Sequence, residues 1–259
     1  AGAKTITATI TSPSTITANL SVTLTFGTAT KLAVSSASVN ATNRVAFASQ
    51  PTITVQDVSG NTVTSAVTSI GASVTSANAA NVTLNGTAVA SASAGIQSYG
   101  DLSLTGIAGT YTITYSANGL TSVTQTVTLV SGAVDHVGLV VPGSANSAAV
   151  LSTQPVATLY DADNNITSST ALVTISVSGA TISGSTTMNA VAGVANFTGK
   201  GIALTGTIGD KTMTASVTIS GTTITSPAQT ISLGYGAPTQ IVLTRAASGF
   251  VNRVAFTVQ

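Results

Sequence analysis

Three oxygen-bearing side chains that could bind a cation stand at alternate positions in the stretch Asp161-Ala-Asp163-Asn-Asn165. A hydrated calcium loop begins with this spacing. The rest of such a loop is missing, because Ile166 stands where the loop needs Gly and Leu172 stands where it needs a bidentate Glu. The sequence therefore offers Asp161, Asp163 and Asn165 as weak calcium ligands. The alternative interpretation is that these side chains cap their own turn.

The only histidine of the chain, His136, directly follows Asp135. An adjacent His and Asp could be two members of a catalytic triad, but a triad also needs a nucleophile that the surrounding structure holds in place. No constellation of reactive residues of that kind stands out in the sequence. We therefore expect a protein that is not an enzyme, without cofactors, and a hydrogen bond between domains at His136.

Four lysines invite comparison with the isopeptide bonds that join Lys to Asn in some proteins: Lys4, Lys31, Lys200 and Lys211. That chemistry needs a buried acid beside the reacting pair, and the chain has only six acidic residues, none of them Glu. We therefore expect no covalent cross-link of this type. Stability must then come from the burial of apolar surface in cores and interfaces.

Carbohydrate is a further partner to consider. Asn-x-Ser/Thr sequons begin at Asn19, Asn40, Asn81, Asn85, Asn165 and Asn196. Because Ser and Thr are abundant, chance alone produces several of these matches. The five tyrosines could form a platform on which sugars stack, but four of them (99, 111, 115 and 160) fall in predicted strands, where packing in the core is commoner. Glycans stay among the partners that the sequence allows.

The composition predicts an all-β protein. Charged residues make up 5% of the 259 residues, apolar residues make up 43%, and much of the remainder is Thr, Ser and Gly. Thr, Val and Ile suit strands because branching at Cβ restricts χ1 in a way that strands tolerate. A net charge of +1 leaves no basic patch for nucleic acid and little self-repulsion between copies. The chain has no Cys, so it has no disulfides or thiolate metal sites.

One stretch sets the organisation of the chain. Residues Gln50 to Asn61 predict an alternating strand that ends in a turn, and Gln154 to Asn165 repeat this pattern. The repeat distance is the same from Gln50 to Gln154 as from Asp57 to Asp161, a step of 104 residues. That step is the size of an immunoglobulin-type sandwich. The chain is therefore predicted to be a tandem array.

The repeat places the domain limits at 30–133 and 134–237, with parts of further units at 1–29 and 238–259. Residues 1–29 match the closing strands of a unit, and Asn252 to Phe256 match Asn43 to Phe47. About seven short strands are expected in each complete unit, with a tight hairpin turn at Asn85-Gly86. The joints are short and contain no Pro-rich or long Gly/Ser stretch, so we expect a stiff, elongated chain.

The motifs of the first unit resemble those of bacterial immunoglobulin-like repeats of the invasin and intimin kind. The resemblance rests on Val55-x-Asp57-x-x-Gly60-Asn61, on Gly95-x-x-x-Tyr99 and on the run from Gly109 to Thr114. The second unit departs from the pattern at the turn, where Asn164 precedes Asn165. The resemblance covers essentially the whole chain. It implies tandem immunoglobulin-like β-sandwich domains on the cell surface, in adhesin stalks, surface layers or fibres alike.

The functional hypothesis from these observations is a structural protein of the extracellular cell surface. Tandem domains with few charges can pack against copies of themselves without desolvating ions, so we expect self-assembly into a surface layer or an extracellular filament. Two alternatives stay open. One is the stalk of a bacterial adhesin, and the other is an accessory module of a secreted glycan-active enzyme. No apolar run approaches the length of a membrane span.

The two ends raise a separate question. Partial units at both ends would expose unpaired backbone edges. The sequence is expected to be an excerpt of a longer array, or else neighbouring copies complete one another head to tail by strand addition.

Overall fold

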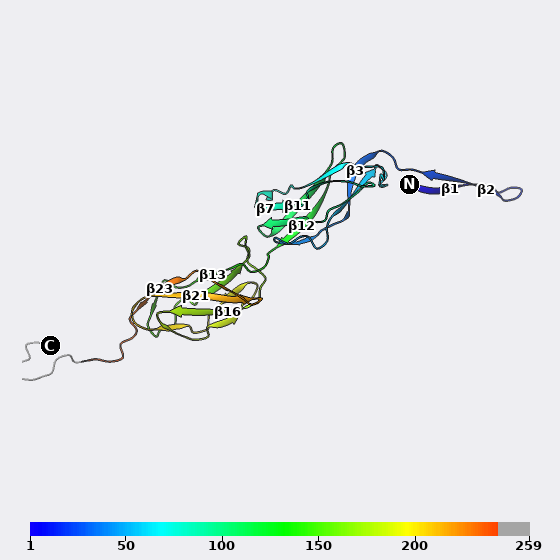
Figure 1. Ribbon diagram of the computed structural model, residues 1–259. Coiled ribbons are helices and arrows are strands. Elements are labelled where there is room, and N and C mark those ends of the chain that lie inside the picture. Colours follow the sequence, from blue (N-terminus) through cyan, green and yellow to red (C-terminus); the bar gives the residue numbers. More distant parts are fainter. Residues whose placement is uncertain (243–259) are drawn as a thin grey trace, which may run out of the picture.

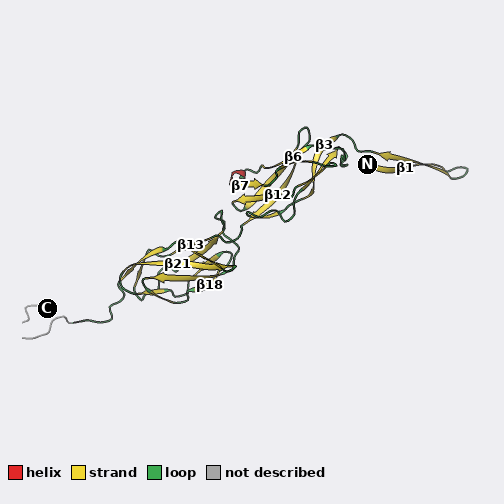
Figure 2. Ribbon diagram, in the orientation of Figure 1, coloured by secondary structure: helices red, strands yellow, loops and turns green. Residues whose placement is uncertain are grey.

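The protein is all-β, as the composition predicts. The computed structural model describes residues 1–242, where strands form all of the regular structure except one 3₁₀ turn at Ala79–Asn81. Figure 2 shows strands in every folded part of the chain. No helix in the described part of the chain is long and apolar enough to cross a membrane. Residues 243–259, which the sequence assigns to a further partial unit, lie outside the described part.

The first sandwich consists of ten strands: β3 (Ala29–Ser36), β4 (Asn40–Thr42), β5 (Thr52–Asp57), β6 (Ser69–Val74), β7 (Val82–Asn85), β8 (Val89–Ser91), β9 (Ile96–Ser98), β10 (Ser103–Gly106), β11 (Gly109–Ser116) and β12 (Val123–Val130). One sheet has the order β4-β12-β11-β6-β8, and the other face is formed by β3-β5-β9 and the pair β10-β7. The short β4 runs parallel to β12, whereas the other strand pairs of this sheet are antiparallel. This arrangement is immunoglobulin-like.

The second sandwich repeats the plan with β13 (His136–Val140), β14 (Ser144–Asn146), β15 (Val156–Tyr160), β16 (Leu172–Ser178), β17 (Thr181–Ser183), β18 (Thr187–Asn189), β19 (Val194–Asn196), β20 (Ala203–Thr205), β21 (Gly209–Ile219), β22 (Thr222–Thr225) and β23 (Gln229–Gly234). The sheet β14-β23-β21-β16-β18 corresponds to the larger sheet of the first sandwich. The smaller face contains β13-β15-β19 and the pair β17-β20. Again a short strand, β14, runs parallel to the last strand.

Strict alternation of residue types places a core between the sheets of each sandwich. In β11, Tyr111, Ile113 and Tyr115 are buried while the threonines between them face outward. In β21 the same positions hold Lys211, Met213 and Ala215. The apolar residues form two separate core clusters, one in each sandwich. The period of two residues along a strand therefore accounts for both cores.

A hairpin, β1 (Gly2–Ile10) and β2 (Ile16–Leu24), precedes the first sandwich. Figure 1 shows the hairpin and the two sandwiches end to end in an elongated chain. The hairpin carries large apolar residues that are more than half exposed, among them Ile6, Ile10, Ile16, Leu20 and Leu24. These are the strands that the sequence assigns to the partial unit 1–29. The opposite partial unit, 238–259, lies almost wholly outside the described residues.

The predicted hairpin at Asn85-Gly86 is wrong. β7 pairs with β10, and β8 pairs with β6, so the turn carries the chain from one sheet to the other. Asp101 holds the turn, because its carboxylate accepts bonds of 2.8 Å from the backbone N–H and from the hydroxyl of Thr87. Gly86 has a φ of 97°, and a Cβ there would lie 2.4 Å from the carbonyl oxygen of Asp101. A long-range cap therefore overrides the local turn preference.

Two buried tyrosines of the first core provide a matched test of its polar contacts. The hydroxyl of Tyr99 donates to the carbonyl of Ile70 at 3.1 Å, whereas the buried hydroxyl of Tyr115 has no partner among the described residues. We expect Tyr99→Phe to lower the free energy of unfolding by about 1 kcal/mol and Tyr115→Phe to leave it unchanged or raise it. Urea titration of both variants measures this. Equal destabilisation by the two substitutions would contradict it.

Candidate functional site at the joint

The turn Asp161–Asn165, which the sequence singles out, lies at the joint between the two sandwiches. It follows β15, and the Asp161 side chain closes it: Asp161 Oδ1 accepts the backbone N–H groups of Asp163 at 3.0 Å and of Asn165 at 2.9 Å. The Asn165 side-chain amide also donates to both oxygens of Asp161. Asp161 is only 1% exposed. Asp161 and Asn165 therefore cap their own turn, whereas the Asp163 carboxylate accepts its bonds from Asn43 and Arg44.

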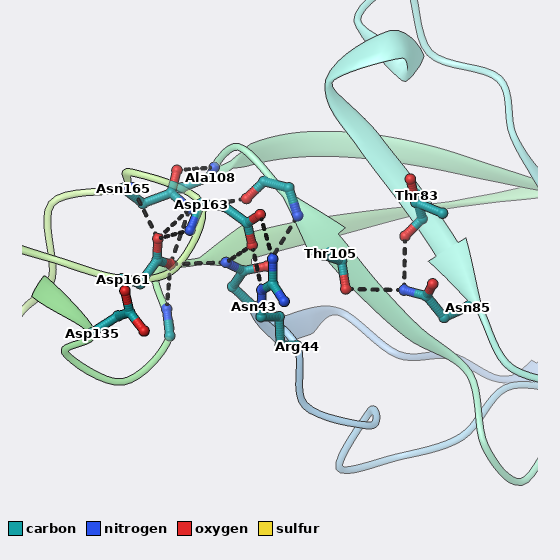
Figure 3. Close-up of polar contacts among 12 residues, drawn as sticks. Asn43, Arg44, Thr83, Asn85, Thr105, Ala108, Asp135, Asp161, Asp163 and Asn165 are labelled. Atoms are coloured by element: carbon teal, nitrogen blue, oxygen red, sulfur yellow. Dashed lines mark hydrogen bonds and ion pairs between the residues drawn. The ribbon is translucent and has the colours of Figure 1, made fainter.

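Side chains of the first sandwich reach into this turn. The side-chain amide of Asn43 donates to Asp161 Oδ2 at 2.9 Å and to Asp163 Oδ2 at 2.7 Å. Arg44 donates two hydrogen bonds of 2.8 Å to the Asp163 carboxylate, from Nε and from Nη2. Figure 3 shows Asn43 and Arg44 facing the two carboxylates. A bidentate pair of this kind fixes orientation as well as distance.

The backbone of the first sandwich and of the linker contributes as well. The N–H of Gly132, which follows β12, donates to Asp161 Oδ2 at 2.8 Å. Asn165 bridges to the loop before β11, since its Oδ1 accepts from Ala108 N–H at 2.7 Å and its amide donates to the Gly106 carbonyl at 2.9 Å. Asn43 Oδ1 accepts from Gly106 N–H at 3.0 Å. Loop, linker and turn therefore form one hydrogen-bonded unit.

The same contacts set the ionisation of the two carboxyl groups. Burial acts to raise the pKa of Asp161, but the bonds from Gly132, Asn165 and Asn43 outweigh it and hold this pKa well below its usual range. The hydrogen bond and charge of Arg44 lower the pKa of Asp163. Both side chains are therefore anionic at neutral pH. A buried anion whose partners belong to the neighbouring sandwich makes the separation of the two sandwiches costly.

The first sandwich carries the counterpart of this turn at Asp57–Asn61. Gly27 N–H donates to Asp57 Oδ2 at 2.8 Å, as Gly132 does to Asp161. Asn61 again donates to its aspartate through its backbone and its side chain, and its Oδ1 accepts from the Ala1 amino group. These bonds, chiefly that from Gly27, lower the pKa of Asp57 to about 2. Ser59 replaces Asp163, and no described side chain reaches this turn as Asn43 reaches Asp161.

The other end of the second sandwich differs in a complementary way. Ser147 and Ala148 occupy the positions of Asn43 and Arg44, one repeat of 104 residues later. Arg44 and Ala148 share a left-handed backbone, with φ of 64° and 61°. The backbone of the joint is therefore kept while the two interacting side chains are not. Asn43 and Arg44 are the site residues that the sequence does not single out as ligands of the turn, although their recurrence at Asn252-Arg253 was a signal.

The cation hypothesis concerns the same oxygens. Asp161, Asp163 and Asn165 do come together, but protein N–H groups from Gly132, Asn43 and Arg44 point at their oxygens. In residues 1–242, no group of three or more His, Cys, Asp or Glu side chains is arranged to hold a metal ion. Calcium binding at this turn stays a prediction, and it would require displacement of these donors.

The predicted hydrogen bond between domains at His136 is wrong. Its Nδ1 lies 3.2 Å from Asp135 Oδ2, within the same sandwich, and its ring stacks on Tyr160 with centroids 5.3 Å apart. Asp135 lines a groove of about 300 Å³ at the joint together with Asn43 and Arg44. No hydroxyl nucleophile is placed against His136 by any bond of the described residues.

The remaining candidate residues do not gather into one site. Tyr99, Tyr111 and Tyr115 are buried in the first core, so they are unable to form a sugar platform, whereas Tyr235 is exposed. Lys211 is buried in the second sandwich, and the other three lysines lie elsewhere. Most of the sequon asparagines (Asn19, Asn40, Asn81, Asn196) are exposed, but Asn165 is buried in the joint. A glycan on Asn165 would disrupt the joint.

Comparison with known proteins supplies no family. No family model matches the chain, and no curated protein matches it in sequence. Solved structures match it at low identity. An adhesin of Escherichia coli, FdeC, is 15% identical over 83% of this chain and 68% of its own, with a TM-score of 0.42.

Two other solved structures that match the chain are not adhesins: one is a surface layer protein and the other is a glycosyl hydrolase. Domains 4–9 of the surface layer protein SbsC are 17% identical over 86% of this chain, with a TM-score of 0.30. A family 2 glycosyl hydrolase of Bacteroides cellulosilyticus is 16% identical over 49% of this chain, with a TM-score of 0.35. The chain spans 34% of the SbsC structure and 17% of the hydrolase. The chain's own strand order defines it as a tandem of immunoglobulin-like sandwiches.

The joint contacts give a prediction with a control built into the chain. Asn43→Ala removes the donor to Asp161 and Asp163, and we expect it to lower the free energy of unfolding by about 1–3 kcal/mol. Ser147→Ala changes the same position of the second sandwich, where the Ser147 side chain makes only bonds of 3.4 Å to Gly206 among the described residues, and we expect little effect. Chemical denaturation of both variants decides this. A loss with Ser147→Ala as large as with Asn43→Ala would contradict the role of the joint.

Proposed function

We propose that this chain is a non-enzymatic structural segment of an extracellular cell surface, and that copies of it associate side by side into a layer or filament. The observation that carries the proposal is the near absence of charged residues from the larger sheet of each sandwich. None of its five strands in the first sandwich (β4, β12, β11, β6 and β8) contains a charged residue. In the second sandwich the corresponding strands and β22 contain only Asp210 and Lys211.

The outward side chains of this sheet form a regular array of hydroxyl groups. Threonines face one another across β11 and β12 in the register Thr110–Thr128, Thr112–Thr126 and Thr114–Thr124. In the second sandwich, Thr212 faces Thr230 and Thr218 faces Thr223. We name these outer surfaces the hydroxyl faces. Such a face offers methyl groups for packing and hydroxyls for hydrogen bonding. In the first sandwich its burial requires no ion to lose its water, and in the second sandwich only Asp210 is a charged side chain on the outward side.

A second copy is the occupant that fits this chemistry. Two copies that meet through uncharged faces bring no like charges together, and the net charge of +1 adds little repulsion. The charged residues Asp161, Asp163 and Arg44 lie instead at the joint, where they hold the sandwiches end to end. The joint therefore keeps the chain extended, and the hydroxyl faces are available for lateral contacts between copies.

Two other functions remain alternatives. The end-to-end arrangement with a hydrogen-bonded joint also suits a stalk that holds a binding tip away from the cell, and a stalk needs few lateral contacts. An accessory module of a secreted glycan-active enzyme would need a catalytic domain outside these residues. Self-association separates the first proposal from both.

Light scattering tests the proposal. We expect the mass of the purified chain to rise with protein concentration and to depend weakly on salt, because few charges are involved. The double variant Thr112→Lys, Thr126→Lys should weaken this association, because it places like charges opposite each other when two faces meet. The control Ser35→Lys, Ser98→Lys adds the same charge to exposed positions of the smaller sheet and should leave it unchanged. A chain that stays monomeric at every concentration would contradict the proposal.

A further inference from the structure

The chain contains two Asn-Gly steps, Asn85-Gly86 and Asn118-Gly119, and they lie in different surroundings. At such a step the backbone nitrogen of Gly can attack the side-chain carbonyl carbon of Asn, because Gly has no Cβ to hinder the approach. The nitrogen loses its proton, a new C–N bond closes a succinimide ring, and the side-chain nitrogen leaves as ammonia. Water then opens the ring at either carbonyl and yields aspartate or isoaspartate.

The side chain of Asn85 is held in place. Its amide nitrogen donates to the Thr105 hydroxyl at 3.0 Å and to the Thr83 carbonyl at 3.3 Å, as Figure 3 shows. Both partners belong to the strand pair β7–β10. The carboxamide is therefore fixed in one orientation, and its rotation requires both bonds to break.

The backbone of the same step is fixed as well. A Cβ at Gly86 would lie 2.4 Å from the carbonyl oxygen of Asp101, so this backbone packs closely against Asp101. Asp101 in turn accepts its two bonds of 2.8 Å from Thr87. Ring closure needs the two reacting atoms in a near-attack geometry. At Asn85-Gly86 both reacting groups are restrained, and the reaction has to displace a capped loop.

Asn118-Gly119 has much weaker restraints. Both residues are exposed, in the turn that joins β11 to β12. One backbone bond of 3.3 Å, from Leu120 to Ala117, closes this turn, and no other residue in 1–242 bonds to the Gly119 N–H or to the Asn118 side chain. A Cβ at Gly119 would have no atom within 4 Å. An exposed segment with so few contacts reaches other conformations easily, near-attack ones among them.

We propose that Asn118 is a self-modification site, at which the Gly119 nitrogen and one water molecule convert the asparagine into aspartate and isoaspartate with loss of ammonia, while Asn85 stays intact. The reaction needs no enzyme and no reactant other than water. Its rate rises with pH because the attacking nitrogen has to lose its proton. This inference goes beyond the proposed function and does not depend on association between copies.

The product changes a sheet that has no charge of its own. Asn118 connects two strands of the larger sheet of the first sandwich, none of whose five strands contains a charged residue. Conversion adds one negative charge there. Isoaspartate also lengthens the main chain by one carbon between Ala117 and Leu120, which both pack against the first core. We therefore expect the converted chain to be more acidic and less stable than the original chain.

Peptide mapping by mass spectrometry tests the site. The full chain is incubated at mildly alkaline pH in water enriched in heavy oxygen, so that each new carboxylate carries the label. We expect the peptide with Asn118 to gain a labelled acid at least about tenfold faster than the peptide with Asn85. In concentrated urea the two rates should become similar, because only the Asn-Gly step itself then remains. Equal rates in the folded chain would overturn the proposal.

Variants test the reason for the difference. Asp101→Ala removes the cap beside Gly86, and Thr105→Val removes an acceptor of the Asn85 amide, so each should speed conversion of Asn85 and leave that of Asn118 unchanged. Failure of both variants to do so would overturn the structural explanation. Asn118→Gln should abolish the labelled acid at this position, because the longer side chain closes a larger ring far more slowly. Acidic forms that still accumulate at the original rate in this variant would place the modification elsewhere and overturn the proposal.

Discussion

The structure depends on one buried anion whose partners come from two sandwiches. Asp161 accepts bonds from its own turn, from the linker at Gly132 and from Asn43, 118 residues away in the chain. A buried carboxylate that loses such donors is strongly destabilised. The two sandwiches are consequently held in one orientation by polar contacts, in a chain whose surfaces are otherwise almost uncharged. Charge is used at the joint, and hydroxyl groups cover the lateral faces.

The two turns show how one backbone serves two kinds of joint. Asp57 and Asp161 have the same local bonds, but Ser59 stands in place of Asp163 and Ser147-Ala148 stand in place of Asn43-Arg44. Arg44 and Asp163 therefore occur together at one joint. This is the arrangement expected if these side chains determine which sandwich can follow another in the array. Such paired substitutions act through both attraction and the penalty of an unpaired charge.

The sequence predicts the fold well because strand periodicity and the repeat are local or periodic signals. Alternation identifies the buried side of β5 and β11, and the 104-residue step sets the phase of both sandwiches. The capping role of Asp161 was predictable for the same reason. The role of Asn43 was not, since a hydrogen bond across 118 residues leaves no local pattern. The prediction of a hairpin at Asn85-Gly86 is wrong for the same reason, because Asp101 from another loop accepts a hydrogen bond from Thr87 in this turn.

The central claim is that the joint makes the two sandwiches one rigid body. Backbone residual dipolar couplings of the weakly aligned chain test it most directly, because each sandwich reports its own alignment. The account predicts one alignment tensor, with the same axes and magnitude for residues 29–130 and 136–234. Two tensors of different magnitude would mean that the sandwiches move independently, and would contradict the account.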